Sequence, residues 1–395
     1  MALDGMLPAN MLIYIFIYGA NILPQAAKAN VLAACGTCGV KPMRVEEVVG
    51  RVRQCIQRMQ GYIPGKQPDD EMRYIKLNTN ENPYPPSPHV LAALHAAIDD
   101  DLRLYPDPQS FRLRETAARL YGCQVDEVIA GNGSDDILTM VFRTFLDAGD
   151  TLVTPAPSYS LYNVLSTLQD ASCIEVPIGP DYTLPETLDT HGAKVIIIVN
   201  PNAPTGVLFS RDTLYHLLTH TQSVVVLDEA YADFAGETAI NLIATFPNLI
   251  VVRTFSKSYA LCGMRLGLGF AHRDVIAQMR KVKDAYNLDR LAIAAGCAAL
   301  QDQDWLRETT AKIIQTRTHM LQTLTEMGLH VPASRTNFVF PRIPNGRALE
   351  VFEELEKRHV LVRYFDTPMT ADRIRVTVGT DDEVAIFLNT LRQLI

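Results

Sequence analysis

The stretch LIVVRTFSKSYALCGMRLGLGF, residues 249–270, decides the fold because it joins an apolar run to a polar turn. The run at 249–252 is continuously apolar, which is typical of a strand buried on both faces of a parallel sheet. A lysine, Lys257, and an arginine, Arg265, follow the run. The stretch therefore predicts a strand that delivers an amine and a guanidinium to the edge of a sheet.

The same pattern recurs from about residue 120, where short apolar runs alternate with helix-like segments. Apolar runs separated by helical segments predict βαβ crossovers and a mostly parallel sheet. In open α/β sheets ligands sit at the carboxyl ends of the strands, so the polar residues directly after the runs are candidates for a site. These candidate segments are 131–136, 157–159, 200–206, 228–231 and 256–257.

The length of 395 residues is enough for a large domain and a smaller one. Residues 305–328 have the pattern of a long helix, and the mixed α/β pattern after them indicates a second domain. We therefore expect an N-terminal extension at 1–42, an N-terminal arm and helix that joins the small domain at 43–75, a large domain at 76–299 and a small C-terminal domain at 300–395.

The N-terminal extension has two interpretations. The apolar run at 11–23 resembles the core of a signal peptide, but it is too short to span a bilayer comfortably, and Asp4 rather than a basic residue precedes it. Alternatively, residues 1–42 lie upstream of the true start, and Met43 begins an ordinary first helix. We favour the second interpretation and expect 1–42 to lie outside the fold.

Composition excludes several classes of function. The net charge of −8 argues against a general surface for nucleic acid or anionic membranes. The seven cysteines are scattered, and the single CxxC at Cys35 and Cys38 has no second pair at zinc spacing. We therefore expect no metal site, reduced thiols and a cytoplasmic protein.

Each polar segment has an ordinary explanation when taken alone, such as a surface lysine, a helix cap or a turn. Together they match the needs of pyridoxal phosphate. This cofactor requires a lysine amine for a Schiff base, an anion beside its protonated ring nitrogen, and a donor to its ring oxygen. It also requires an aromatic face for stacking and a phosphate cradle, which a helix N-terminus and an arginine supply.

The order GNGSDD (131–136), PSY (157–159), NPNAPTG (200–206), DEAY (228–231) and SKSYALCGMRLG (256–267) resembles the class I/II aminotransferases among the fold-type I pyridoxal-phosphate enzymes. LNTNENPY (77–84), RLYPDP (103–108) and RIRVTVGTDDE (373–383) resemble signatures of the histidinol-phosphate aminotransferase branch. The resemblance runs from about residue 60 to 390. It implies a homodimer whose large domain binds the cofactor on a mostly parallel seven-stranded sheet flanked by helices, beside a smaller α/β domain.

The resemblance also implies roles for individual residues. Lys257 would form the Schiff base and then act as base and acid of the proton shift. Asp228 would pair with the ring nitrogen, Tyr231 would hydrogen-bond the ring oxygen, and Tyr159 would stack on the ring. The phosphate would be held by the backbone amides of Ser134 and Asp135, the Ser256 hydroxyl, Arg265, and Tyr105 reaching across from a neighbouring subunit.

One position departs from the family pattern. The family's NPxNPTG motif has an asparagine directly before PTG that contacts the ring oxygen, and here this position is Ala203. Asn202 is one residue earlier, and a shift by one residue normally changes the direction of a side chain. We keep Asn202 as a candidate and expect Tyr231 to carry more of this contact.

The substrate side resembles the same branch. Arg375 resembles the arginine that holds the anionic group of the substrate, and Arg363 resembles a second arginine that this branch pairs with it. Tyr62 and Asn337 resemble further pocket residues. Histidinol phosphate carries a phosphate and no carboxylate, so a double guanidinium clamp suits it, and 2-oxoglutarate or glutamate would use the same arginines.

Three alternatives are weighed against this interpretation. An aromatic amino-acid aminotransferase shares the scaffold, and Arg375 alone would hold its α-carboxylate. A phosphothreonine decarboxylase uses a similar clamp. A transcription regulator with this fold needs an N-terminal DNA-binding domain, for which the residues before Met43 are too few and too apolar.

Overall fold

The computed structural model describes residues 43–68, 74–179, 182–185, 188 and 192–395. The chain divides into two compact units, Met1–Arg58 and Met59–Ile395. In the first unit the described residues form two short helices, α3 (Val45–Val49) and α4 (Gln54–Arg58). The extension expected at 1–42 lies outside the described residues.

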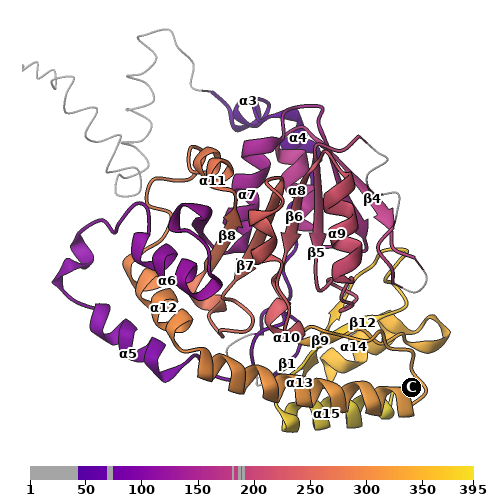
Figure 1. Ribbon diagram of the computed structural model, residues 1–395. Helices are drawn as coiled ribbons and strands as arrows, with labels where there is room; N and C mark the ends of the chain where they lie inside the picture. Colours follow the sequence, from indigo (N-terminus) through magenta and orange to yellow (C-terminus); the bar gives the residue numbers. More distant parts are fainter. Residues whose placement is uncertain (1–42, 69–73, 180–181, 186–187, 189–191) are drawn as a thin grey trace, which may run out of the picture. The chain divides into compact units, whose positions relative to one another are not determined.

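The second unit is built around a seven-stranded sheet with the strand order β2-β8-β7-β6-β5-β3-β4 (Figure 1). Neighbouring strands from β7 through β4 are parallel, and β8 is antiparallel to both of its neighbours. The mostly parallel seven-stranded sheet predicted from the sequence is therefore confirmed. Its strands are β2 (Val128–Asn132), β3 (Thr151–Ala156), β4 (Ser172–Pro177), β5 (Val195–Val199), β6 (Val224–Asp228), β7 (Leu249–Thr254) and β8 (Leu266–Ala271).

Both faces of the sheet are buried along its inner strands, such as β5 and β7, which explains their continuous apolar runs. Along β5, Ile196 and Ile198 belong to one apolar cluster, whereas Ile197 and Val199 belong to another. Each fully buried side chain of this kind contributes roughly 1.5–3 kcal/mol. The first cluster includes residues of α6 (Phe111–Tyr121), α9 (Arg211–His220) and α12 (Arg290–Gln301), and the second includes residues of α7 (Ser134–Phe145), α8 (Leu161–Leu168) and α11 (Arg273–Met279).

The register of the parallel strands brings their carboxyl ends to one edge. Val199 of β5 is opposite Asp228 of β6, and Asp228 is opposite Val252 of β7. The short helix α10 (Ala232–Ala235) follows β6 directly. Polar residues that follow these strands therefore start from neighbouring positions.

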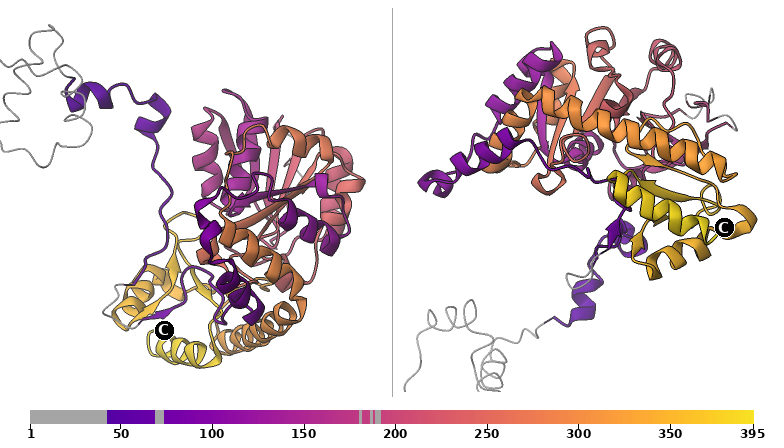
Figure 2. Two further views of the ribbon diagram at one scale, coloured as in Figure 1. Left: turned by 90° about the vertical axis from the view of Figure 1, so that its left-hand side faces the viewer. Right: turned by 90° about the horizontal axis from the view of Figure 1, so that it is seen from below.

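The C-terminal part of the second unit forms smaller sheets. β11 (Arg363–Tyr364), β12 (Ile374–Thr377) and β9 (Phe338–Val339) make an antiparallel sheet, and β1 (Ile75–Lys76) pairs in parallel with β10 (Val360–Leu361). The long helix α13 (Gln303–Glu326) packs beside α15 (Asp381–Arg392), as both views of Figure 2 show. The remaining helices are α5 (Pro88–Ala97), which packs on α12, and α14 (Ala348–Lys357). Within the described ranges, no helix is long and apolar enough to cross a membrane.

Candidate active site

Lys257 lies in the loop that follows β7, with its side chain half-buried. Its Nζ donates a hydrogen bond of 3.0 Å to the carbonyl of Thr79, and the amide of Asn82 donates to the Lys257 carbonyl over 3.1 Å. Burial lowers the pKa of Lys257 to about 8, and the positive charge of Arg375 lowers it further in the same direction. An amine with such a pKa is partly neutral near pH 8 and is therefore a good nucleophile.

Asp228 is the last residue of β6 and is 4% exposed. Its carboxylate accepts hydrogen bonds from the hydroxyl of Tyr162, at 2.9 Å, and from the backbone N–H of Ala230, at 3.1 Å. Burial raises the pKa of Asp228 to about 6, although both hydrogen bonds oppose the change. Among the described residues it has no cationic partner within ion-pair distance, so a positively charged ligand atom would find a ready counter-ion here.

Tyr231 is the residue directly before α10, and its buried ring meets the Phe338 ring edge-on, with 5.2 Å between centroids. Its hydroxyl accepts a hydrogen bond of 2.9 Å from the side-chain amide of Asn80, a residue that is 1% exposed. Because Asn80 supplies the hydrogen, the proton of the Tyr231 hydroxyl is free for another acceptor. Sequence reasoning missed Asn80, although it lies inside the quoted segment 77–84.

The orientation of the Asn80 amide follows from Thr377. The Thr377 hydroxyl oxygen accepts the backbone N–H of Asn80 at 3.0 Å and then donates its own hydrogen to the Asn80 side-chain oxygen at 3.2 Å. The NH₂ group is therefore the one that faces Tyr231. Asn80 has a φ of 56°, in the left-handed region that asparagine tolerates better than most residues.

An anion cradle forms where α7 begins. The residue before the helix, Gly133, has a φ of 85° and provides no capping side chain, so the first amides of α7 are not capped from that position. Arg265 lies over this end, and a Cβ at Gly133 would approach its Nη2 to 2.6 Å. Arg265 also donates to Ser256 Oγ over 3.4 Å and to Asp135 Oδ2 over 3.2 Å. Backbone amides, a hydroxyl and a guanidinium thus converge as phosphate sites require.

Tyr159 connects the cradle to the buried carboxylate. Its hydroxyl donates to Asp135 over 3.4 Å, and its ring meets the ring of Tyr162 edge-on at 5.6 Å. Tyr62 packs against Tyr159 in a second edge-on contact, with centroids 5.7 Å apart. Burial raises the pKa of Tyr159, so its phenol stays protonated and the ring keeps a neutral face for a ligand.

Asn202 is fully buried, and its side-chain amide bonds to its own loop and to the loop that follows β3. Its side-chain oxygen accepts the Thr205 hydroxyl at 2.6 Å, and its NH₂ group donates to the carbonyl of Pro157 at 3.3 Å. Ala203, the position that departs from the family motif, belongs to the same apolar cluster as Tyr231. The contact of Asn202 with a ring oxygen stays a prediction, whereas Tyr231 has a hydrogen to donate.

Arg363 and Arg375 are opposite each other in the β11–β12 pair. Both guanidinium groups lie near one aromatic ring, that of Phe365, at 5.3 Å for Arg363 and 5.2 Å for Arg375. With the described residues, their hydrogen bonds go to backbone carbonyls, at 2.9–3.2 Å. Within the described part of the chain neither arginine has a carboxylate partner, so two cations converge on a place that a substrate anion would neutralise.

Among the residues that the structure describes, two buried polar atoms at this place have no hydrogen-bond partner, namely Nε of Arg375 and the side-chain oxygen of Asn337. The amide nitrogen of Asn337 donates to the carbonyl of Asn80 over 2.9 Å, so Asn337 contacts the residue whose side chain bonds to Tyr231. Burial lowers the pKa of Arg375, and the nearby Arg363 acts in the same direction. Buried polar atoms without partners are rare in folded proteins and are satisfied here if a polar ligand binds.

Tyr105 is the predicted site residue that stands apart. It is 81% exposed and stacks on Tyr286 with 4.4 Å between ring centroids. In the structure as described, no hydrogen bond or ring contact joins it to the other site residues. Contacts connect Ser256, Arg265, Asp135, Tyr159 and Tyr62 in one series, and Tyr162 extends this series to Asp228. Asn80 connects Tyr231 with Asn337. Lys257 contacts Thr79 and Asn82, and Asn202 contacts Thr205 and Pro157.

The chain matches the family model for class I and II aminotransferases over residues 73–391. It is 44% identical to a histidinol-phosphate aminotransferase of Geotalea uraniireducens, covering 87% of this chain and 99% of that protein. It is 42% identical to the protein of the same name in Syntrophotalea carbinolica, with the same coverage of 87% and 99%. Among solved structures, it resembles the histidinol-phosphate aminotransferase of Sinorhizobium meliloti in complex with pyridoxal-5′-phosphate, with a TM-score of 0.80, 26% identity, and coverage of 87% of this chain and 98% of that one.

Proposed function

Because this chain belongs to the class I and II aminotransferases, and within them to the histidinol-phosphate aminotransferases, we propose that it exchanges an amino group between L-histidinol phosphate and 2-oxoglutarate. The products of this exchange are imidazole acetol phosphate and glutamate, and in histidine biosynthesis the reaction runs in the opposite direction. The predicted family, the fold-type I α/β architecture and the transaminase class are confirmed by matches that span most of the chain.

The cofactor that we propose is pyridoxal 5′-phosphate, and the residues of this site fit it. The uncapped start of α7, Ser256 and Arg265 suit the phosphate, and Gly133 leaves the space that this cradle needs. Asp228, which has no cationic partner among the residues described, suits a protonated ring nitrogen. When bound, the cofactor supplies an electron sink for the charge that develops at the substrate carbon.

The chain's own groups divide the remaining work. Lys257, whose pKa is lowered to about 8, has a neutral fraction near physiological pH, so it would hold the cofactor and would move a proton at the substrate carbon. The Asp228 carboxylate would stabilise positive charge on the ring nitrogen, and Tyr231, whose hydroxyl accepts its hydrogen bond from Asn80, would donate its own hydrogen to the ring oxygen. Tyr159, whose phenol stays protonated, would offer the face of its neutral ring for stacking.

One observation carries the choice of substrate: Arg363 and Arg375 converge on Phe365 without a carboxylate partner in the described residues. Paired guanidinium groups hold a phosphate or a carboxylate through parallel hydrogen bonds. Histidinol phosphate presents a phosphate, and 2-oxoglutarate presents a carboxylate, so both half-reactions can use the pair. An aromatic amino acid needs one guanidinium only, which leaves the second cation unexplained.

The partner that we propose is a second copy of the chain. Tyr105 is far more exposed than is usual for a tyrosine, and other apolar side chains near it along the chain, such as Leu102 and Leu104, are also exposed. A second subunit would cover them and would bring Tyr105 toward a neighbouring phosphate cradle. A cytoplasmic location stays part of the proposal and is consistent with the free cysteines of the described residues.

A comparison of amino donors tests this function. The purified protein, supplied with pyridoxal phosphate and 2-oxoglutarate, is given histidinol phosphate, phenylalanine or tyrosine, and glutamate is measured. We expect kcat/KM to be highest for histidinol phosphate. A clear preference for phenylalanine or tyrosine would instead support the aromatic alternative, and no glutamate with any donor would reject the proposal.

A further inference from the structure

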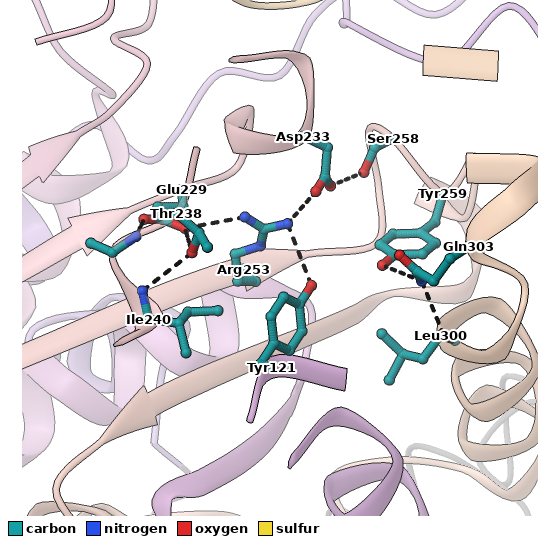
Figure 3. A network of polar contacts seen from close by, with 11 residues as sticks. Tyr121, Glu229, Asp233, Thr238, Ile240, Arg253, Ser258, Tyr259, Leu300 and Gln303 are labelled. Carbon is teal, nitrogen blue, oxygen red and sulfur yellow. Dashed lines mark hydrogen bonds and ion pairs between the residues drawn. The ribbon is translucent and has the colours of Figure 1, made fainter. Parts of the chain in front are cut away.

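A buried polar network surrounds Arg253, a residue of β7 that is 5% exposed (Figure 3). Its Nη1 donates a hydrogen bond of 3.1 Å to Glu229, and its Nη2 donates to Asp233. The guanidinium also lies 5.6 Å from the centre of the Tyr121 ring and donates to the Tyr121 hydroxyl over 3.4 Å. One guanidinium thus bridges two carboxylates and an aromatic ring inside the protein.

Both carboxylates are fixed by further donors. Glu229 accepts the hydroxyl of Thr238 and the backbone N–H of Ala239, each at 2.6 Å. Asp233 accepts the hydroxyl of Ser258 (Figure 3). Each carboxylate is therefore held in one orientation, and neither can follow the guanidinium if it moves.

The positions of these partners along the chain connect the network to the active site. Glu229 directly follows Asp228, and Glu229 and Asp233 lie two residues before and after Tyr231. Ser258 directly follows Lys257. The guanidinium of Arg253 therefore holds both ends of the segment that carries Tyr231 and, through Asp233, the residue after Lys257.

None of these contacts reaches the faces of Lys257, Asp228 or Tyr231 that the proposed cofactor would use. The lysine amine bonds to Thr79, the Asp228 carboxylate to Tyr162, and the Tyr231 hydroxyl to Asn80. The network supports the backbone that carries the three residues and leaves their functional atoms free.

We propose that Arg253 is a positioning residue that sets the spacing of Lys257, Asp228 and Tyr231. If the proposed function holds, these three residues contact the cofactor. The planar fork of arginine is suited to this task because it reaches two carboxylates at once with fixed geometry. The ammonium group of a lysine at the same place offers a point charge on a flexible stem and would bond well to one carboxylate at a time. Such sites need their reactive groups held within about 0.5 Å.

The rival explanation is that Arg253 contributes only to stability. Arg114 offers a matched control, because it is also a buried arginine, 6% exposed, and it donates to the carbonyls of Gln109 at 2.7 Å and Val125 at 2.8 Å. Its partners are not residues of the active site. Arg114→Lys therefore measures the effect of losing a buried guanidinium fork without disturbing the spacing of the three residues.

The first readout is taken on cofactor-free protein, so it does not depend on the proposed function. An amine-acylating reagent labels Lys257 in competition with surface lysines, and mass spectrometry follows the labelling against pH. In the unaltered protein we expect the midpoint near the lowered pKa of about 8 for Lys257. Arg253→Lys should move this midpoint upward by about one pH unit, toward that of an exposed lysine, whereas Arg114→Lys should leave it unchanged.

The second readout is kinetic, on protein loaded with pyridoxal phosphate. Misplacement of reacting groups lowers kcat, so we expect Arg253→Lys to lose about 10- to 100-fold in kcat with KM within about threefold. Ser258→Ala, which removes one hydroxyl and is the milder variant if Arg253→Lys folds poorly, should shift the labelling midpoint in the same direction by a smaller amount. If both variants keep the midpoint of the unaltered protein while Tm falls as it does in Arg114→Lys, the positioning role is overturned.

Discussion

The side-chain amide of Asn80 donates a 2.9 Å hydrogen bond to the hydroxyl of Tyr231, although the two residues are 151 positions apart in the chain. Thr377 fixes the direction of this bond, because its hydroxyl occupies the oxygen of the same amide. The consequence is that Tyr231 always has its own hydrogen to give. A site with Ala203 in place of the family's asparagine still has one donor for a ring oxygen.

The polarity of this bond can be reversed. In Asn80→Asp the new carboxylate accepts the Tyr231 hydrogen and withdraws it from the ligand, whereas Asn80→Ala only removes the donor. We expect kcat of the aspartate variant to fall about tenfold or more below that of the alanine variant. Equal losses of kcat in the two variants, with similar Tm values, would show that the direction of the hydrogen bond is unimportant.

Asp228 gives a prediction about pH. Its pKa in the folded protein is raised to about 6 from an ordinary 3.8, so the folded state binds the proton more tightly than the unfolded state. The raised pKa therefore adds to the free energy of unfolding below pH 4. This contribution of about 2–3 kcal/mol is lost as the pH rises toward and through 6. Urea unfolding of the cofactor-free protein at pH 4, 5, 6 and 7 measures it.

Asp228→Asn is the control for this pH dependence, since an amide does not titrate. The fall in unfolding free energy between pH 4 and 6 should be smaller in the variant by about the same 2–3 kcal/mol. Parallel profiles for the two proteins would contradict the raised pKa of Asp228.

The close approach of Gly133 and Arg265 predicts that a methyl group at Gly133 damages the phosphate cradle. A Cβ there would lie 2.6 Å from Arg265 Nη2, and the φ of 85° is unfavourable for alanine. We expect Gly133→Ala to weaken the binding of pyridoxal phosphate by about tenfold or more. Gly122→Ala carries the same backbone strain, with a φ of 71° and no atom within 4 Å of the new Cβ, and should bind the cofactor normally in equilibrium dialysis. If both variants lost the same affinity for pyridoxal phosphate, backbone strain alone would explain the weaker binding.

The two arginines of the β11–β12 pair predict a shared effect on both substrates. Arg363→Lys replaces a fork by a point charge, and we expect kcat/KM to fall about 10- to 100-fold for histidinol phosphate and for 2-oxoglutarate. Arg342→Lys, an exposed arginine paired with Asp372, is the control and should have kcat/KM within about twofold of the unaltered protein. A loss for one substrate only would show that the pair does not serve both.

Much of this arrangement is predictable from the sequence because it repeats a local pattern. The apolar runs at 195–199, 224–227 and 249–252 form strands, and Asp228 and Lys257 follow the ends of two of them, at the carboxyl edge of the sheet. The antiparallel direction of β8 is not predictable in this way, since an apolar run has the same appearance in either direction.

The contacts that join distant segments are also invisible in the pattern. Asn80 meets Tyr231 only because β1 and the residues after it lie against the C-terminal part of the unit. In the sequence, Arg253 is simply a polar residue that follows an apolar run. Its contact with Glu229 depends on the pairing of β6 with β7, which the sequence pattern does not reveal. Local periodicity carries no information on such pairs.

The most direct test of the whole account is a single half-reaction. Protein loaded with pyridoxal phosphate is mixed with histidinol phosphate in the absence of any keto acid, and the visible absorbance of the cofactor is followed alongside an Lys257→Ala control. We predict that the absorbance disappears in the unaltered protein, with one equivalent of imidazole acetol phosphate formed per active site, and that the control forms almost none. An unchanged absorbance with histidinol phosphate, or equal product from the Lys257→Ala protein, would contradict the account.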